Sequence, residues 1–160
     1  MITLPADAYE VVLRLSAAAL IGGCIGLDRE VRRKPAGMRT HALVSLGAAL
    51  VVLVAVRFPG VDHISAVTRV IQGIIAGVGF LGAGTILKSD HEMVHGLTTA
   101  ASIWLVATLG IACGIGQWIA ALVALALALI ILILGEPVEA LVHRIAGKRG
   151  VPPTEPETRQ

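Results

Sequence analysis

The chain has 160 residues, of which 56% are hydrophobic and only 15% are charged, and its mean hydropathy is +0.83. Soluble domains average about 25% charged residues, so this composition excludes an ordinary soluble domain and indicates several membrane-spanning helices. The formal net charge of +2 is too small to indicate a nucleic-acid partner.

Five apolar segments approach the length of about 20 residues that a helix needs to cross about 30 Å of hydrocarbon. We therefore predict an all-α membrane protein with one five-helix transmembrane domain at residues 1–135. Its spans are expected at residues 9–27, 41–56, 70–87, 97–113 and 117–134. Residues 136–160 are expected to form a tail. The tail begins either as a short amphipathic helix on the membrane surface or as the solvated end of the fifth helix, and its end, rich in proline, is expected to be disordered.

The distribution of positive charge predicts how these helices are oriented. Ten of the thirteen Lys and Arg residues lie in residues 28–40, residues 88–96 and the tail. Only two lie in the alternating segments, at Arg57 and Arg69, and Arg14 lies inside the first span. Because cytoplasmic loops carry the excess of Lys and Arg, we expect the N-terminus outside and the C-terminus in the cytoplasm.

Residues 28–40 are the densest block of charge and hold five of the thirteen Lys and Arg residues. This loop separates the first two spans, and we expect it to carry the specific recognition that the protein performs. Its two acids are placed among arginines, which favours a salt-bridged loop over a magnesium site. The candidate partner- or ligand-binding residues here are Asp28, Arg29, Glu30, Lys34, Arg39 and Thr40.

Residues 37–42 and 96–101 are similar to each other, and each precedes an apolar helix. If helices one and two repeat as helices three and four, two helix N-termini meet on the cytoplasmic side. Thr40 and either Thr98 or Thr99 would then cap these helices. Two interpretations stay open: the threonines only cap, or the two N-termini also bind an anion.

Two glycine patterns with the spacing Gly-x-x-x-Gly, one in the first span and one in the third, predict faces where helices pack closely. The third span also contains the spacing G-x-G-x-x-G, but it lacks the preceding strand that a dinucleotide site requires. A helix broken at residues 79–84, as in transporters, is the alternative. The glycines concerned are Gly22, Gly26, Gly73, Gly77, Gly79, Gly82 and Gly84.

Catalytic groupings are not evident in the sequence. There is no Ser/His/Asp or Cys/His arrangement, and Cys24 and Cys113 are the only cysteines. We therefore expect no enzymatic activity, no cofactor and no metal site. Arg14, with Glu10 four residues before it, is either a structural ion pair or a functional charge in the membrane.

With these residues considered, the chain resembles the MgtC/SapB family of bacterial inner-membrane proteins. The resemblance rests on residues 22–30, 34–41, 72–84 and 96–104. The string Lys-Pro-Ala-Gly-x-Arg-Thr-His at residues 34–41 is its most specific part. Asp28 stands where many members carry Glu, which keeps the charge.

The resemblance implies a five-helix inner-membrane protein that is linked to magnesium homeostasis and to adaptation to magnesium limitation. It implies a regulator that acts on other integral membrane proteins within the lipid bilayer. An assembly scaffold that forms a homo-oligomer is a further interpretation. The alternative is a transporter or channel for magnesium or another ion. Only about 25 residues follow the last predicted helix, whereas the family's namesake carries a soluble C-terminal domain, so we expect the membrane core to be the shared part.

Overall fold

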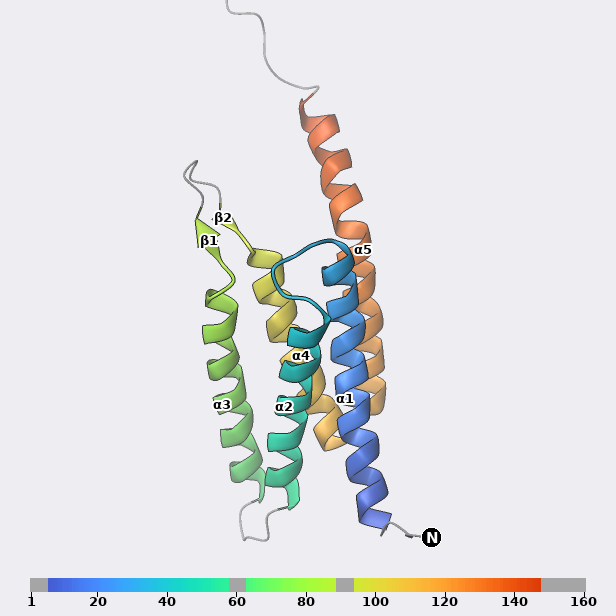
Figure 1. The fold of residues 1–160 in the computed structure, drawn as a ribbon, viewed down its shortest axis with the longest axis vertical. Coiled ribbons are helices and arrows are strands. Elements are labelled where there is room, and N and C mark those ends of the chain that lie inside the picture. The colour runs from blue at the N-terminus through green and yellow to red at the C-terminus, as the bar shows by residue number, and fades with distance from the viewer. Residues whose placement is uncertain (1–5, 58–62, 89–93, 148–160) are drawn as a thin grey trace, which may run out of the picture.

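The computed structural model describes residues 6–57, 63–88 and 94–147. Five helices run up and down in an elongated bundle, with the N-terminus and the last helix end at opposite ends (Figure 1). They are α1 (Ala6–Val31), α2 (Met38–Arg57), α3 (His63–Ala83), α4 (Leu97–Ile115) and α5 (Trp118–Gly147). Between α3 and α4, β1 (Leu87–Lys88) pairs antiparallel with β2 (Val94–His95).

All five helices are long and apolar enough to cross a membrane. The predicted all-α membrane fold with five spans is therefore confirmed, and β1 and β2 add only two residues each. The second helix begins at Met38, three residues before the predicted span at residue 41. The orientation of the bundle stays a prediction from the distribution of charge.

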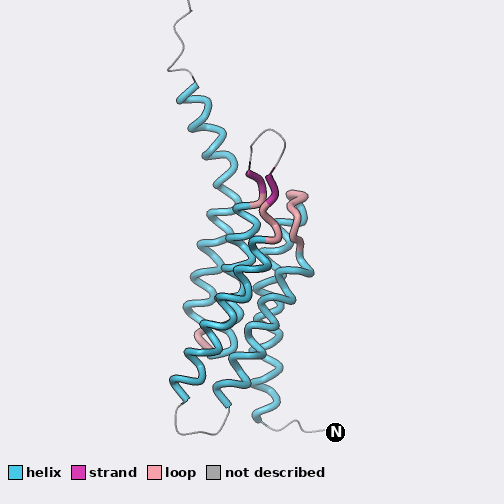
Figure 2. The backbone as a smooth tube through the Cα atoms, turned by 90° about the vertical axis from the view of Figure 1, so that its left-hand side faces the viewer, coloured by secondary structure: helices cyan, strands magenta, loops and turns pink. Residues whose placement is uncertain are grey.

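Helix α4 is the centre of the bundle. In its apolar stretch of 18 residues, 56% of the residues are buried, compared with 6% in the corresponding stretch of α3 and 11% in that of α5. Helices α1 and α2 pack against each other and against α4. Helix α3 lies at one edge, beside α2 and α4, and α5 covers α1 and α4 on the other side (Figures 1 and 2). The outer helices therefore present most of their apolar side chains to lipid.

Two apolar clusters fill the interior. One joins α1, α4 and α5 through residues such as Ile25, Leu109 and Ala121. The other joins α2, α3 and α4 through residues such as Val52 and Ile103. Helix packing in a membrane depends on close van der Waals contact, and these clusters supply it.

The predicted glycine contacts are present in α1. A Cβ atom added at Gly22 would lie 2.5 Å from the His41 carbonyl oxygen, and one at Gly26 would lie 2.6 Å from the Met38 Cα atom. Only glycine allows α1 and α2 to approach this closely.

The glycines of α3 differ from the prediction. Among the described residues, no atom of another helix lies within 4 Å of a Cβ added at Gly73, Gly77 or Gly79, so these positions make no close contact with a described helix. A Cβ added at Gly82 would lie 3.5 Å from the Ala100 Cβ, an ordinary van der Waals contact. One added at Gly84 would lie near the Phe80 and Leu81 carbonyl oxygens at the end of α3. Helix α3 is also unbroken to Ala83, and Gly84 follows in a turn, so the alternative of a broken helix is not what the fold shows.

Helix α5 continues through Pro137 to Gly147, well past the predicted span end at residue 134. Residues 136–147 are thus the end of the fifth helix, one of the two predicted possibilities, and they extend beyond the rest of the bundle (Figure 2). The predicted disordered end of the tail, residues 150–160, lies outside the described residues.

Candidate functional site at the charged end

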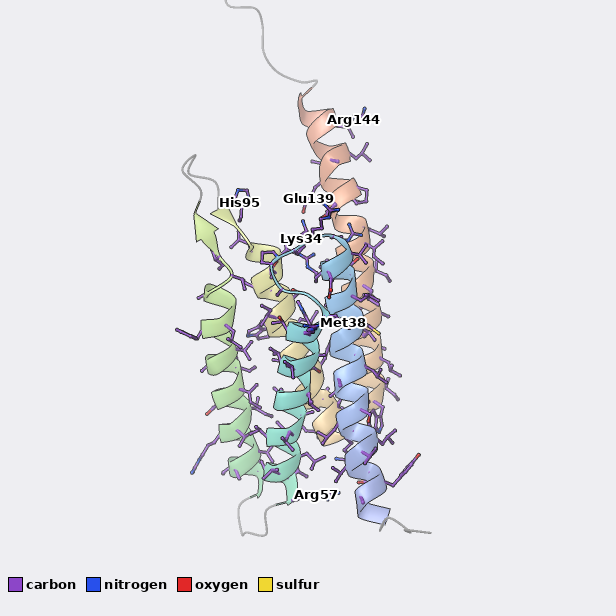
Figure 3. All side chains as sticks on the ribbon, in the orientation of Figure 1. Lys34, Met38, Arg57, His95, Glu139 and Arg144 are labelled. Atoms are coloured by element: carbon purple, nitrogen blue, oxygen red, sulfur yellow. The ribbon has the colours of Figure 1, made fainter. Side chains whose placement is uncertain are left out.

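The charged end is the end of the bundle where α1 ends, where α2 and α4 begin, and where α5 passes the loop at residues 32–37. Figure 3 shows Lys34, Met38 and Glu139 toward this end and Arg57 at the opposite end. Nearly all the partner- or ligand-binding residues that the sequence predicts lie at this end.

The end of α1 is a Schellman motif. The Lys34 N–H donates to the Arg29 carbonyl and the Arg33 N–H donates to the Glu30 carbonyl, both at 2.9 Å. The motif places Arg33 in the left-handed region, with φ at 55°. This turn directs the chain back toward α2.

The start of α2 is capped by Glu30, which lies on α1. The Glu30 carboxylate accepts the Met38 N–H at 2.9 Å, and a Cβ added at Gly37 would lie 2.9 Å from the same carboxylate. The Gly37 carbonyl in turn accepts the backbone N–H of His41 at 3.2 Å. The string at residues 34–41 therefore builds the junction between α1 and α2.

The prediction that threonines cap the two helices is wrong. Thr40 is the third residue of α2, and the cap of this helix is supplied by Glu30, which accepts the Met38 N–H. The N-cap of α4 is Gly96, with φ at 92° and no side-chain capping bond. Thr98 and Thr99 lie inside the first turn of α4.

A buried polar network joins α2 to α4. His41 is fully buried, with Nδ1 2.9 Å from the Gly37 carbonyl oxygen and Nε2 2.9 Å from the Ser102 hydroxyl. The Ser102 hydroxyl is also 2.8 Å from the Thr99 carbonyl oxygen. Sequence reasoning did not select His41 or Ser102, although both lie within the stretches that carry the family resemblance.

Arg29 is the buried cation of the site, with 2% of its surface exposed. Its Nη2 donates to the Thr99 hydroxyl at 3.4 Å, and its buried Nε has no acceptor among the described residues. The adjacent Asp28 accepts Arg32 Nε on one carboxylate oxygen at 2.9 Å, and its other oxygen is buried without a described partner.

Glu136 joins α5 to the loop at residues 32–37 through two ion pairs. Its two carboxylate oxygens lie 2.8 Å from Arg32 Nη1 and 3.0 Å from Lys34 Nζ. Hydrogen bonding to Asp28, and then to Glu136, raises the pKa of the Arg32 guanidinium. The sequence analysis missed Glu136, because no local pattern shows that an acid after the fifth span meets a loop 104 positions earlier.

Most of the predicted partner- or ligand-binding residues line one or both of two hollows at the charged end. A cavity of about 260 Å³ is lined by Arg29, Lys34 and Thr98 and by residues of α5 that include Glu136 and Glu139. A shallower groove of about 470 Å³ is lined by Glu30, Lys34, Gly37, Arg39 and Thr40. Lys34 lines both. Thr99 is buried and Asp28 is partly buried, and neither residue lines either hollow.

Two other predicted features lie apart from these hollows. Arg14 is at the opposite end, where it pairs with Glu10 at 3.3 Å and donates to the Gly114 carbonyl at 2.9 Å. These contacts correspond to a structural role. Within the described ranges, no group of three or more His, Cys, Asp and Glu side chains is placed to hold a metal ion.

Comparison with known proteins gives the family of the chain. A profile of the MgtC family matches residues 15–141, which include both hollows and the buried network. The chain belongs to the MgtC family. With five membrane-spanning helices and bacterial relatives, this MgtC family chain is a multi-pass bacterial membrane protein.

Three relatives illustrate the similarity. Protein SrpB of Synechococcus elongatus is 46% identical over 122 residues, which are 70% of this chain and 67% of SrpB. Protein MgtC of Salmonella typhimurium is 41% identical over 120 residues, 72% of this chain and 48% of that protein. The putative magnesium transporter YhiD of Escherichia coli K12 is 40% identical over 114 residues, 68% and 53% of the two chains.

The match thus spans between about half and two thirds of the length of these curated relatives. No solved structure matches the chain.

Proposed function

We propose that this protein regulates other integral membrane proteins of the bacterial inner membrane during adaptation to magnesium limitation, and that it is not an enzyme. Its contact surface is the groove at the charged end that Glu30, Lys34, Arg39 and Thr40 line. The distribution of Lys and Arg along the sequence supports a cytoplasmic position for this surface.

The observation that carries the proposal is how the polar groups around this groove are used. Glu30 caps α2, Lys34 pairs with Glu136, and Gly37 binds His41, so the loop is held in one conformation. Arg39 and Thr40 remain exposed on this support. A fixed backbone that presents a few exposed polar side chains suits recognition, since little entropy is lost when a partner binds.

The interior of the bundle gives further support. Below the charged end, most of the fully buried side chains are apolar, with Ser45 as a polar exception; the apolar ones include Ile25, Val52, Ile103, Val106 and Leu109. A path for a hydrated ion needs polar groups or water along its length. This apolar filling favours regulation over conduction.

The test compares two charge changes at opposite ends of the molecule. Arg39→Glu alters the groove, and Gln117→Glu alters an exposed position between α4 and α5. In magnesium-starved cells, we expect Arg39→Glu to remove co-purifying membrane proteins and the growth benefit, while Gln117→Glu preserves both. Equal amounts of both variants in the membrane are the control. Unchanged co-purification with Arg39→Glu contradicts the proposal.

Magnesium transport is the second candidate. It is supported by the acids Glu136 and Glu139 on the wall of the cavity and by the name of the YhiD relative, a putative magnesium transporter. Purified protein in liposomes would then carry magnesium faster than empty liposomes, and Glu139→Gln would slow that flux. No flux above empty liposomes contradicts this candidate.

A further inference from the structure

We propose that the cavity of about 260 Å³ at the charged end binds a phosphate group, held by Arg29 and the first turn of α4. The proposal depends on the charges around this cavity. It is independent of the proposed regulatory function, which depends on the separate groove beside Arg39.

The first observation is the state of Arg29. Its side chain is almost completely buried, yet it forms no ion pair with any described residue. Among the described residues, its one side-chain hydrogen bond is the long one to Thr99, and its Nε has no acceptor there. The carboxylates of Asp28 and Glu136 act on Arg29 electrostatically but form no ion pair with it. A buried charge without a directly bonded counter-ion is costly, and from this we infer that an anion completes the site.

The second observation is the position of the guanidinium at the start of α4. Helix α4 has 19 residues, and its N-cap, Gly96, provides no side-chain capping bond. The first N–H groups of such a helix are unsatisfied and carry partial positive charge. Arg29 Nη2 donates to the Thr99 hydroxyl in this turn at 3.4 Å, so the guanidinium charge lies close to the positive end of α4. An anion between them removes the conflict and binds both.

The cavity provides space where this anion is needed. Arg29 and Thr98 both line it, and so does Lys34, whose charge is paired with Glu136. One water occupies about 30 Å³ in the liquid, so the hollow accepts a group several times larger. A phosphate group presents several acceptor oxygens, which suits the donors of Arg29, the Thr98 hydroxyl and the helix N–H groups.

The acids on the wall restrict which phosphate binds. Glu136 is already neutralised by Arg32 and Lys34, but Glu139 forms no ion pair among the described residues. Ile131 and Leu132 add an apolar side to the cavity. The phosphate group therefore comes either from a phospholipid headgroup or from inorganic phosphate, and experiment distinguishes the two sources.

The test measures thermal unfolding of the detergent-purified full chain. Inorganic phosphate is compared with potassium chloride at equal ionic strength, and phosphatidylethanolamine is added to delipidated protein in a separate series. At about 100 times Kd, we expect a rise in Tm of about 5–10 °C with at least one of the two. A rise with inorganic phosphate assigns a soluble ligand, and a rise with lipid alone assigns the headgroup.

Three variants locate the site. Arg29→Met keeps the length of the side chain and removes the charge, so it should abolish the rise while the unliganded Tm is maintained or increased. Thr98→Asp places a carboxylate in the first turn of α4, so it should block the ligand and raise the unliganded Tm even if Arg29→Met does not fold. Arg39→Gln removes an exposed cation from the other groove and should keep the full rise.

The proposal is overturned if neither ligand shifts the Tm of the unmodified chain. It is equally overturned if Thr98→Asp keeps the full rise, or if Arg39→Gln loses as much of it as Arg29→Met. The first result would show that the chain has no phosphate site. Either of the other two would show that Arg29 and the start of α4 do not form the site.

Discussion

The spacing Gly-x-x-x-Gly occurs at two helix pairs with opposite results. It gives close packing between α1 and α2 but not between α2 and α3. In α1, Gly22 and Gly26 bring the backbone against His41 and Met38 of α2. In α3, Gly73 and Gly77 have the same spacing, but no atom of another described helix lies within 4 Å of a Cβ added at either position. The spacing creates a flat helix face, but it does not determine whether another helix of the chain occupies it.

The difference has a physical origin in the loops and the polar groups. Helix α1 is joined to α2 by a short, internally bonded turn with Glu30 as its cap, which brings the two helix ends together. Between α2 and α3, an apolar groove of about 430 Å³ lies beside Gly47, Gly73 and Gly77. Lipid solvates apolar surface as well as another helix does, so no hydrophobic force closes this groove.

The largest effect expected from this comparison is that of a bulky residue at the close contact. Gly26→Leu forces a side chain into the Met38 backbone, so we expect a loss of at least about 3 kcal/mol of stability, or failure to fold. Gly77→Leu, the matched change in α3, should fold normally. Thermal unfolding in detergent measures both. Similar losses in the two variants would mean that both faces are packed in solution.

A smaller effect is expected from the polar network that fixes α2 on α4. Ser102→Ala leaves Nε2 of the buried His41 without its partner, which should cost about 1–3 kcal/mol. Thr68→Ala is the control, since the exposed Thr68 hydroxyl binds only the Ile64 carbonyl of its own helix. The double variant His41→Leu/Ser102→Ala should recover part of the loss if the unpaired imidazole is the cause. Equal stability of Ser102→Ala and Thr68→Ala would argue against the network.

The smallest effect is expected from alanine at the open face. Gly77→Ala adds a methyl group into free space and improves helix propensity, so we expect a gain of about 0.5–1 kcal/mol. Gly22→Ala makes the same chemical change but places the methyl group against the His41 carbonyl, so stability should fall. Chemical unfolding curves of the two variants measure the difference in sign. A loss with Gly77→Ala would show that this face has a partner in the sample.

Much of the fold follows from local sequence properties. Each span has enough apolar residues in succession to cross the bilayer, so hydropathy and length alone predicted the five helices. The loop at residues 28–40 was recognisable because charge interrupts apolar sequence there. Its role as a capped junction was not recognisable, since Glu30 reaches Met38 only after the turn at Arg33 has formed.

The site itself depends on pairs of residues that are distant in sequence. Arg29 meets Thr99 across 70 positions, His41 meets Ser102 across 61, and Arg32 meets Glu136 across 104. Periodicity and composition act over one or two helical turns and carry no information about such pairs. The sequence by itself thus determined the number of helices and the charged loop between the first two. Only helix packing decided which glycines are in contact and left Arg29 buried, without an ion pair to any described residue, beside the start of α4.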